Sequence, residues 1–168
     1  LKIKWPDVKE LSPVGINPNV LMHQLSAASK NAFAYTADVG SHQMWAAQSL
    51  QLASDQLFIT SGGMGAMGFS LPGGISASIA NHNKPVVVIV GDGSMQLNIQ
   101  ELQTIVRNKL PIKIVVMNNQ TLGMIRQFQD SYFESRYQST YWGYDVPNFE
   151  KIAQAYGIRA TTIENPSQ

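Results

Sequence analysis

The sequence predicts an α/β fold in which a doubly wound parallel sheet carries helices on both faces. The clearest observation is the run of β-branched residues at 86–90, which is followed by a second such run at 112–117. Continuous apolar runs of this length are typical of strands buried on both faces of a parallel sheet. Strand-like and helix-like segments also alternate along the chain, as parallel strands require, because each crossover needs a long connection.

The chain of 168 residues has the length of a single domain. We predict strands over residues 33–36, 57–60, 86–90, 112–117 and 158–163. We predict helices over residues 18–30, 41–52, 69–80, 98–108 and 148–156. Residues 120–144 are rich in Gln, Tyr, Phe and Arg, and we expect them to form a partly helical excursion beside the functional site.

The helices of the first half follow from their ends and their composition. Asn17 is a favoured N-cap and Pro18 suits the first helical position, so the first helix begins there. Residues 41–52 carry apolar side chains available for burial. Residues 69–80 are rich in Gly and Ala, and such small residues would let this helix approach the sheet closely.

The helices of the second half are predicted from their capping residues. Asn98 and Glu101 have the spacing of a capping box, which favours a helix that begins at Asn98. Pro147 and Asn148 start the next helix, and Gly157 ends it.

The composition excludes several classes of function. The twelve Lys and Arg residues are scattered and the net charge is +1, which gives no support for binding to nucleic acid or to a membrane surface. The absence of cysteine excludes disulfides, iron–sulfur and thiolate zinc sites, and a Cys nucleophile. No apolar run reaches membrane-spanning length and no signal peptide is recognisable, so we expect a cytoplasmic protein.

Both β-branched runs end in polar residues suited to a metal that carries phosphates. Residues 91–94 (Gly-Asp-Gly-Ser) follow the first run, and residues 118–119 (Asn-Asn) follow the second. Ligands of open α/β sheets bind at the carboxyl ends of the strands, so Asp92 and Asn119 are expected on the same rim. Carboxylate and amide oxygens suit a hard cation. A tight turn would explain either motif alone, but it explains the two together less well.

A glycine-rich loop offers a competing interpretation. Residues 63–68 satisfy G-x-G-x-x-G between a predicted strand and a predicted helix, and Asp92 ends the following strand. This is the pattern of a dinucleotide-binding unit. It gives no role to the glycines beside Asp92 or to the Asn-Asn pair, so NAD binding is disfavoured.

Four motifs resemble the acetolactate (acetohydroxyacid) synthase catalytic subunits, which are thiamine diphosphate enzymes. They are the Gly-Asp-Gly with the Asn-Asn pair, residues 38–48 (DVGSHQMWAAQ), the loop 62–69 and residues 122–124 (LGM). They occur in the family's order and at its spacing. The resemblance implies the thiamine diphosphate-binding fold in a domain at 17–168. A linker at 1–16 from a missing upstream domain would precede it, and its C-terminal end would be truncated.

The resemblance also implies a Mg²⁺ site and a set of cofactor contacts. The Asp92 carboxylate, the Asn119 amide oxygen and the backbone carbonyl of Thr121 would hold Mg²⁺, with two diphosphate oxygens and a water completing an octahedron. The backbone N–H groups of Gly93 and Ser94 would meet the phosphates. The whole expected cofactor-binding set is Ser41, His42, Gly65, Met67, Gly91, Asp92, Gly93, Ser94, Asn119, Thr121, Gly123 and Met124.

Three of these residues have particular roles in the resembling family. His42 corresponds to a contact on the phosphate side, and Gly65 to a backbone contact with the aminopyrimidine. Met67 matches the bulky residue that supports the V-shaped conformation of the cofactor; without the resemblance it would be ordinary core. No catalytic residue is expected in this chain, because the family's activating glutamate lies in a separate pyrimidine-binding domain. The glutamates assigned instead to solvated or capping roles are Glu101, Glu134 and Glu150.

Two positions depart from the family pattern. Ser41 stands where close relatives commonly have Gln, so one diphosphate contact would be lost or mediated by water. Phe128 stands where the synthases typically have Trp, which makes Phe128 the expected determinant of acceptor preference. The alternative role for Phe128 is hydrophobic packing beneath the excursion.

The resemblance implies an enzyme of branched-chain amino acid biosynthesis. It would decarboxylate pyruvate or another 2-oxo acid on thiamine diphosphate and ligate the product to a second 2-oxo acid. The pyrimidine-binding domain of the same or a partner subunit would complete the site, in a homodimer or homotetramer. FAD, where the complete enzyme carries it, would bind to another domain. The alternatives are a different thiamine diphosphate decarboxylase or carboligase, and a non-catalytic cofactor-binding or dimerisation module.

Overall fold

The computed structural model describes residues 15–168, so the expected linker lies almost entirely outside the described residues. Four strands form one sheet in the order β2-β1-β3-β4. The strands are β1 (Ala34–Ala37), β2 (Leu57–Thr60), β3 (Val86–Gly91) and β4 (Ile112–Met117). All neighbouring strands are parallel, which confirms the predicted sheet.

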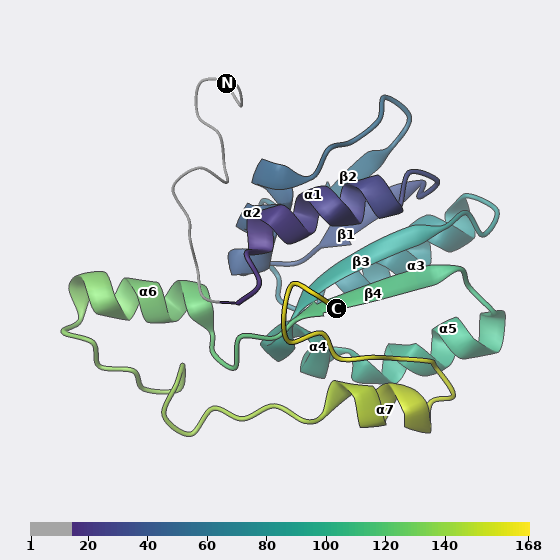
Figure 1. Cartoon of the computed structure of the whole chain (residues 1–168). Helices are drawn as coiled ribbons and strands as arrows, with labels where there is room; N and C mark the ends of the chain where they lie inside the picture. Colours follow the sequence, from purple (N-terminus) through teal and green to yellow (C-terminus); the bar gives the residue numbers. More distant parts are fainter. Residues whose placement is uncertain (1–14) are drawn as a thin grey trace.

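Helices cover both faces of this sheet (Figure 1). They are α1 (Pro18–Ala28), α2 (Ser41–Ser49), α3 (Ser70–Ala80), α4 (Asp92–Leu97), α5 (Leu102–Asn108), α6 (Gly123–Tyr132) and α7 (Phe149–Ala155), with a 3₁₀ turn η1 (Ile99–Glu101). Residues of α1 and α2 pack on one face, and residues of α3, α5 and α7 pack on the other. The doubly wound α/β class is therefore confirmed.

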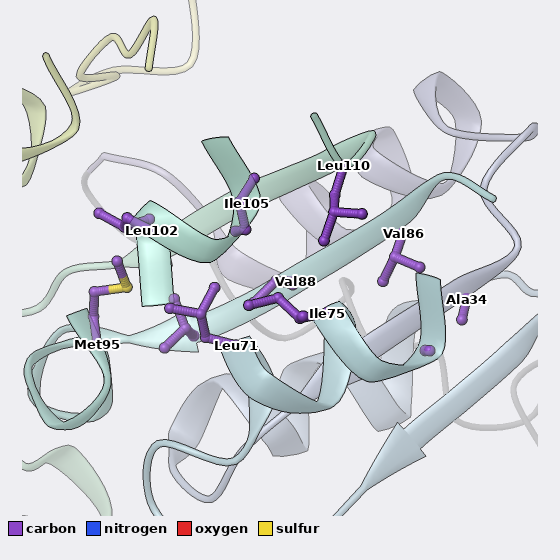
Figure 2. Close-up of a cluster of buried hydrophobic side chains, with 11 residues drawn as sticks. Ala34, Leu71, Ile75, Val86, Val88, Met95, Leu102, Ile105 and Leu110 are labelled. Carbon is purple, nitrogen blue, oxygen red and sulfur yellow. The ribbon is translucent and has the colours of Figure 1, made fainter. Parts of the chain in front are cut away.

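Strand β3 divides the core into two clusters because all of its residues are buried. Val87 and Ile89 face the cluster that contains Met22 of α1 and Ala46 of α2. The alternate residues of β3 face the second cluster, and Figure 2 shows its members from α3 and α5 around Val86 and Val88. This alternation is the two-residue period of a strand with cover on both faces.

The N-caps of α1 and α7 are those that the sequence predicts. The side-chain oxygen of Asn17 accepts from the backbone N–H groups of Asn19 at 2.9 Å and Val20 at 3.2 Å. The side-chain oxygen of Asn148 accepts from the N–H of Lys151 at 2.9 Å. Each contact satisfies an N–H group that has no partner within its helix.

Helix α3 lies close against the sheet, as its small residues predict. A Cβ atom on Gly74 would come within 2.5 Å of the Val88 Cγ2 and 3.1 Å of the Thr36 Oγ1. The Thr36 hydroxyl donates to the backbone carbonyl of Ser70 at 2.8 Å, which fixes the first turn of α3 to β1. Only glycine at position 74 permits this approach.

The predicted helix at 98–108 is present as η1 and α5 after Asn98, but the predicted capping box is wrong. The chain becomes helical at Asp92, directly after β3, breaks at Asn98 and resumes through η1 and α5. Asn98 makes no capping bond; its amide donates instead to the carbonyl of Gly68 at 2.8 Å. The Glu101 carboxylate accepts from the Thr104 hydroxyl at 2.8 Å. A tertiary contact with the glycine-rich loop therefore replaces the expected capping box.

The predicted strand at 158–163 is also wrong. Gly157 ends α7 with a φ of 76°, and the Ile158 N–H donates to the carbonyl of Ala153 at 2.9 Å. Beyond that turn, residues 159–168 are exposed, and within the described part of the chain β3 is the only strand partner of β4. The segment buries no side chains that would hold it in a ladder, so β4 remains at the edge of the sheet.

The predicted excursion at 120–144 is partly helical, as expected. It contains α6, which extends outward from the carboxyl end of the sheet, followed by irregular chain (Figure 1). Over residues 15–168, no helix combines the length and apolar character that a bilayer crossing requires.

Candidate functional site

A cavity of about 310 Å³ lies at the carboxyl ends of β1, β3 and β4. The connections from β1 and β3 lead to opposite ends of the sheet, so this is the topological switch point at which open α/β sheets bind ligands. Every residue of the expected cofactor-binding set lines this cavity: Ser41, His42, Gly65, Met67, Gly91, Asp92, Gly93, Ser94, Asn119, Thr121, Gly123 and Met124. The additional lining residues are Val39, Gly40, Trp45, Met117, Leu122 and Ile125.

Asp92 presents a buried carboxylate with one oxygen unpaired. Its Oδ1 accepts from the N–H of Gly93 at 2.9 Å, but its Oδ2 has no hydrogen-bond partner among the described residues. Burial raises the pKa of the Asp92 carboxyl, while the backbone N–H groups of Gly93 and Gln120 and the Tyr144 hydroxyl oppose that shift. A divalent cation would supply the missing partner and favour the charged form.

Tyr144 is a neighbour of Asp92 that the sequence did not indicate. Its buried hydroxyl falls short of full hydrogen-bond geometry, but it lies close enough to the Asp92 carboxyl to interact with it both as a hydrogen-bonding group and through charge. Burial and the Asp92 charge raise the pKa of the Tyr144 phenol. Tyr144 belongs to the aromatic excursion, and no motif or spacing connected it with Asp92.

Asn119 and Thr121 lie on the loop that leads from β4 into α6. The Asn119 side-chain oxygen accepts from the Thr121 N–H at 3.3 Å, which closes a local turn. The carbonyl of Thr140 accepts from the Thr121 hydroxyl at 2.5 Å and from the Leu122 N–H at 3.2 Å. The far end of the excursion is thus tied to the residues beside the cavity.

Two glycines allow the chain to close around the site. A Cβ atom on Gly93 would come within 2.9 Å of the Leu122 side chain. A Cβ atom on Gly123 would come within 2.9 Å of both the Asn119 amide nitrogen and the Ser41 hydroxyl. The starts of α2, α4 and α6 therefore meet at distances that larger residues would not permit.

His42 is buried in the first turn of α2. Its Nε2 lies 2.5 Å from Oδ1 of Asp38, and because a carboxylate only accepts, the imidazole donates. Asp38 was absent from the expected site residues, although it opens the motif at 38–48. Its position at the end of β1 was the available signal.

The glycine-rich loop forms another wall of the cavity. Gly65 has a φ of 61°, and its N–H donates to the Ser61 carbonyl at 2.8 Å. Met67 is half-buried and lines the cavity. The loop follows β2, and β1 separates β2 from β3, the strand that Asp92 follows. A dinucleotide unit places its acidic residue on the adjacent strand, so the topology speaks against the NAD interpretation.

Phe128 lies on α6 but does not line the cavity. Its side chain is 56% exposed, and its ring packs on Tyr132 and Phe133 with centroids 4.6 Å and 6.1 Å away. Phe128 is thus neither buried in the core nor part of the cavity wall, and its role in acceptor preference stays a prediction. Ile125, one turn earlier on α6, does line the cavity.

Among the described residues, no glutamate lines the cavity. The Glu150 carboxylate accepts from the Thr162 hydroxyl at 2.8 Å, and Glu134 is exposed. The Glu101 carboxylate is engaged with Thr104. The described chain thus offers the cavity no carboxyl group other than that of Asp92.

Residues 38–168 match the family model for the thiamine pyrophosphate enzyme, C-terminal TPP binding domain. The chain is 41% identical over 162 residues to an acetolactate synthase large subunit of Porphyra purpurea, which covers 96% of this chain and 27% of that protein. It is 46% identical over 149 residues to the acetolactate synthase isozyme 2 large subunit of Escherichia coli, covering 89% and 27%. The chain thus spans about a quarter of the length of these curated relatives.

A solved structure has the same fold. The thiamine diphosphate-dependent 4-hydroxybenzoylformate decarboxylase of Rhodococcus jostii superposes with a TM-score of 0.78 at 25% identity, over 92% of this chain and 29% of that one. Fold, cavity position and family match agree. The chain belongs to the thiamine pyrophosphate enzymes, and it is a C-terminal TPP-binding domain of that family.

Proposed function

We propose that this chain is the diphosphate-binding part of an acetolactate synthase that decarboxylates pyruvate, or another 2-oxo acid, and ligates the product to a second 2-oxo acid. The observation that carries the proposal is the cavity at the switch point, in which an unpaired oxygen of Asp92 lies buried beside residues of the family motifs. Relatives named acetolactate synthase, at 41% and 46% identity, support the choice of reaction.

The residues present fit a Mg²⁺ ion that carries the diphosphate. Asp92 supplies a buried carboxylate oxygen without a partner, and Asn119 supplies an amide oxygen from the neighbouring strand end. The backbone carbonyl of Thr121 would be the third protein ligand. Oxygen ligands of this kind, few in number and completed by phosphate, suit Mg²⁺ better than an all-protein cage would.

The other lining residues would bind and orient the cofactor. The Gly65 N–H is already bonded within the loop, so its carbonyl is the backbone group left for an aminopyrimidine. His42, Ser41 and Ser94 would contact the diphosphate side, and Met67 would support the bent cofactor. When bound, thiamine diphosphate supplies the nucleophilic carbon and the electron sink for decarboxylation.

The complete enzyme would need a second domain, further subunits and a compartment in which it acts. The activating glutamate would come from a pyrimidine-binding domain of the same or a partner subunit, in a cytoplasmic homodimer or homotetramer. FAD, where present, would bind elsewhere in the complete protein.

The product that the complete enzyme makes from pyruvate tests this function. With thiamine diphosphate and Mg²⁺, we expect the enzyme to make acetolactate and CO₂. Chromatography would detect the acetolactate, and gas release would measure the CO₂. Acetaldehyde as the main product would instead indicate a simple decarboxylase. The absence of turnover, together with retained cofactor binding, would favour a non-catalytic module.

Phe128 is predicted to weaken the preference for larger acceptors. We expect the complete enzyme to discriminate weakly between 2-oxobutyrate and pyruvate, because phenylalanine covers less of the extra carbon than tryptophan would. One methylene in an apolar pocket is worth about 1–3 kcal/mol, so Phe128→Trp should raise the 2-oxobutyrate preference several-fold. Competition between the two acceptors, read as the product ratio, measures this.

The control is Ile79→Trp, because Ile79 is also a half-exposed apolar residue but lies near the C-terminal end of α3 and does not line the cavity. Its product ratio should equal that of the natural enzyme. A strong natural preference for 2-oxobutyrate, unchanged by Phe128→Trp, would remove Phe128 from the acceptor site.

A further inference from the structure

We propose that Asp38 is a positioning residue that holds His42 and the glycine-rich loop in the arrangement required by the diphosphate cofactor. The inference rests on the proposed function, and it deepens that function by naming a residue outside the cavity wall. Asp38 is fully buried at the end of β1 and is not itself a lining residue. It would act on the cofactor only through its neighbours.

The Asp38 carboxylate connects two walls of the cavity. Its Oδ1 accepts from the His42 imidazole at 2.5 Å, in the first turn of α2. Its Oδ2 accepts from the Gly68 N–H at 3.1 Å and from the Ser70 hydroxyl at 2.9 Å, where the loop enters α3. These donors satisfy a carboxylate that would otherwise be costly to bury. One side chain therefore links the two walls directly.

The bond from His42 also fixes which edge of the ring a ligand can meet. With Nε2 bound to Asp38, Nδ1 is the ring nitrogen that remains for a ligand. A Cβ atom on Gly40 would come within 2.6 Å of Nδ1, and one on Gly91 within 3.0 Å. The first glycine of the Gly-Asp-Gly motif thus leaves room for this edge of His42, while Asp38 holds the opposite edge.

Two roles for Asp38 make different predictions. A carboxylate that only stabilised the start of α3 would need Gly68 and Ser70, and it would not need His42. The bond to His42 adds a partner that does line the cavity. Removing the carboxylate should therefore change cofactor affinity through His42, beyond any effect on folding.

The test is a double-mutant cycle in the complete enzyme, with thiamine diphosphate binding measured by calorimetry in the presence of Mg²⁺. Loss of the partner that orients a metal-ligating histidine costs about 10- to 100-fold in affinity. His42 would contact the diphosphate and not the metal, so for Asp38→Asn we expect the lower end of that range, about tenfold weaker binding. If Asp38 acts in part through His42, then the combined loss in Asp38→Asn with His42→Ala should be smaller than the product of the two single losses, and what remains reports the loop side of Asp38. Independent, multiplying losses would overturn the proposal.

A second variant keeps the test decisive if Asp38→Asn does not fold. Ser70→Ala removes one donor from Asp38 but changes no lining residue. We expect it to weaken thiamine diphosphate binding about threefold, as the loss of a single hydrogen bond predicts. Unchanged affinity in this variant would contradict the bridge between the walls.

The same titrations separate failure of this inference from failure of the proposed function. If the parent enzyme binds thiamine diphosphate but the losses at Asp38 and His42 multiply, the role of Asp38 is overturned and the proposed function stands. If the parent enzyme does not bind thiamine diphosphate with Mg²⁺, both are overturned.

Discussion

Replacement of Asp92 by alanine in the complete enzyme is expected to abolish the Mg²⁺-dependent binding of thiamine diphosphate. The unpaired Oδ2 of Asp92 is the buried anionic oxygen that the described residues offer to a cation in this cavity. Loss of residues that merely support metal ligands costs about 10- to 100-fold, so loss of a ligand itself should exceed that range. Calorimetric titration with and without Mg²⁺ measures the effect.

The variant should lose binding without losing its fold. Burial raises the pKa of Asp92, so its charged form opposes folding at neutral pH in the absence of metal. The destabilisation by the charged carboxylate is absent below the ordinary pKa of an Asp, grows as the pH rises above it, and is complete above the raised pKa of the folded state. Asp92→Ala is therefore expected to keep or raise the Tm of the metal-free enzyme.

The matched control for Asp92→Ala is Asn118→Ala. Asn118 neighbours Asn119, but it is exposed, does not line the cavity and accepts only from the Gln120 N–H at 3.1 Å. The Asn118→Ala enzyme should bind thiamine diphosphate with the affinity of the natural enzyme. Parent-like affinity in Asp92→Ala would remove Asp92 from the metal site, and binding of NAD in the same assay would favour the dinucleotide interpretation.

The 168-residue chain on its own is expected to release no CO₂ from pyruvate, even with saturating thiamine diphosphate and Mg²⁺. The described residues place no glutamate on the cavity, and Glu150, Glu134 and Glu101 have other surroundings. The family's activating glutamate therefore has no substitute here. CO₂ release by this chain should be measured and compared with release by the complete enzyme. Circular dichroism would confirm that the chain alone is folded.

CO₂ release by the folded chain alone would show that no second domain is needed. It would also require another group, such as His42, to take the role assigned to the glutamate. Recovery of turnover when a pyrimidine-binding domain is added would support the division of the site between two domains.

Residue types and short patterns predicted the buried strands and two of the helix starts. The β-branched runs became β3 and β4, and Asn17 and Asn148 cap α1 and α7 as their residue types favour. The errors arose where tertiary contacts decided the outcome. Asn98 bonds to Gly68, some 30 residues away, so its capping preference is not used.

The site was predictable to the extent that motifs mark strand ends. Asp92 and Asn119 reach the same cavity because β3 and β4 are adjacent and parallel. Tyr144 and Asp38 were missed for physical reasons. Tyr144 follows Thr140, whose carbonyl accepts from Thr121 and Leu122 and so holds the end of the excursion near the start of α6. Asp38 is hydrogen-bonded to His42 without lining the cavity itself, and motifs for cofactor contacts do not indicate such a residue.

The most direct test of the central claim is the position of the metal in crystals of the complete enzyme grown with thiamine diphosphate and Mn²⁺. Anomalous diffraction should show one peak in contact with the side-chain oxygens of Asp92 and Asn119 and with the backbone carbonyl of Thr121, at about 2.1 Å as for a small hard cation. Diphosphate density beside that peak would complete the predicted arrangement. Bound diphosphate with no metal between it and Asp92, or a metal elsewhere on the sheet edge, would contradict it.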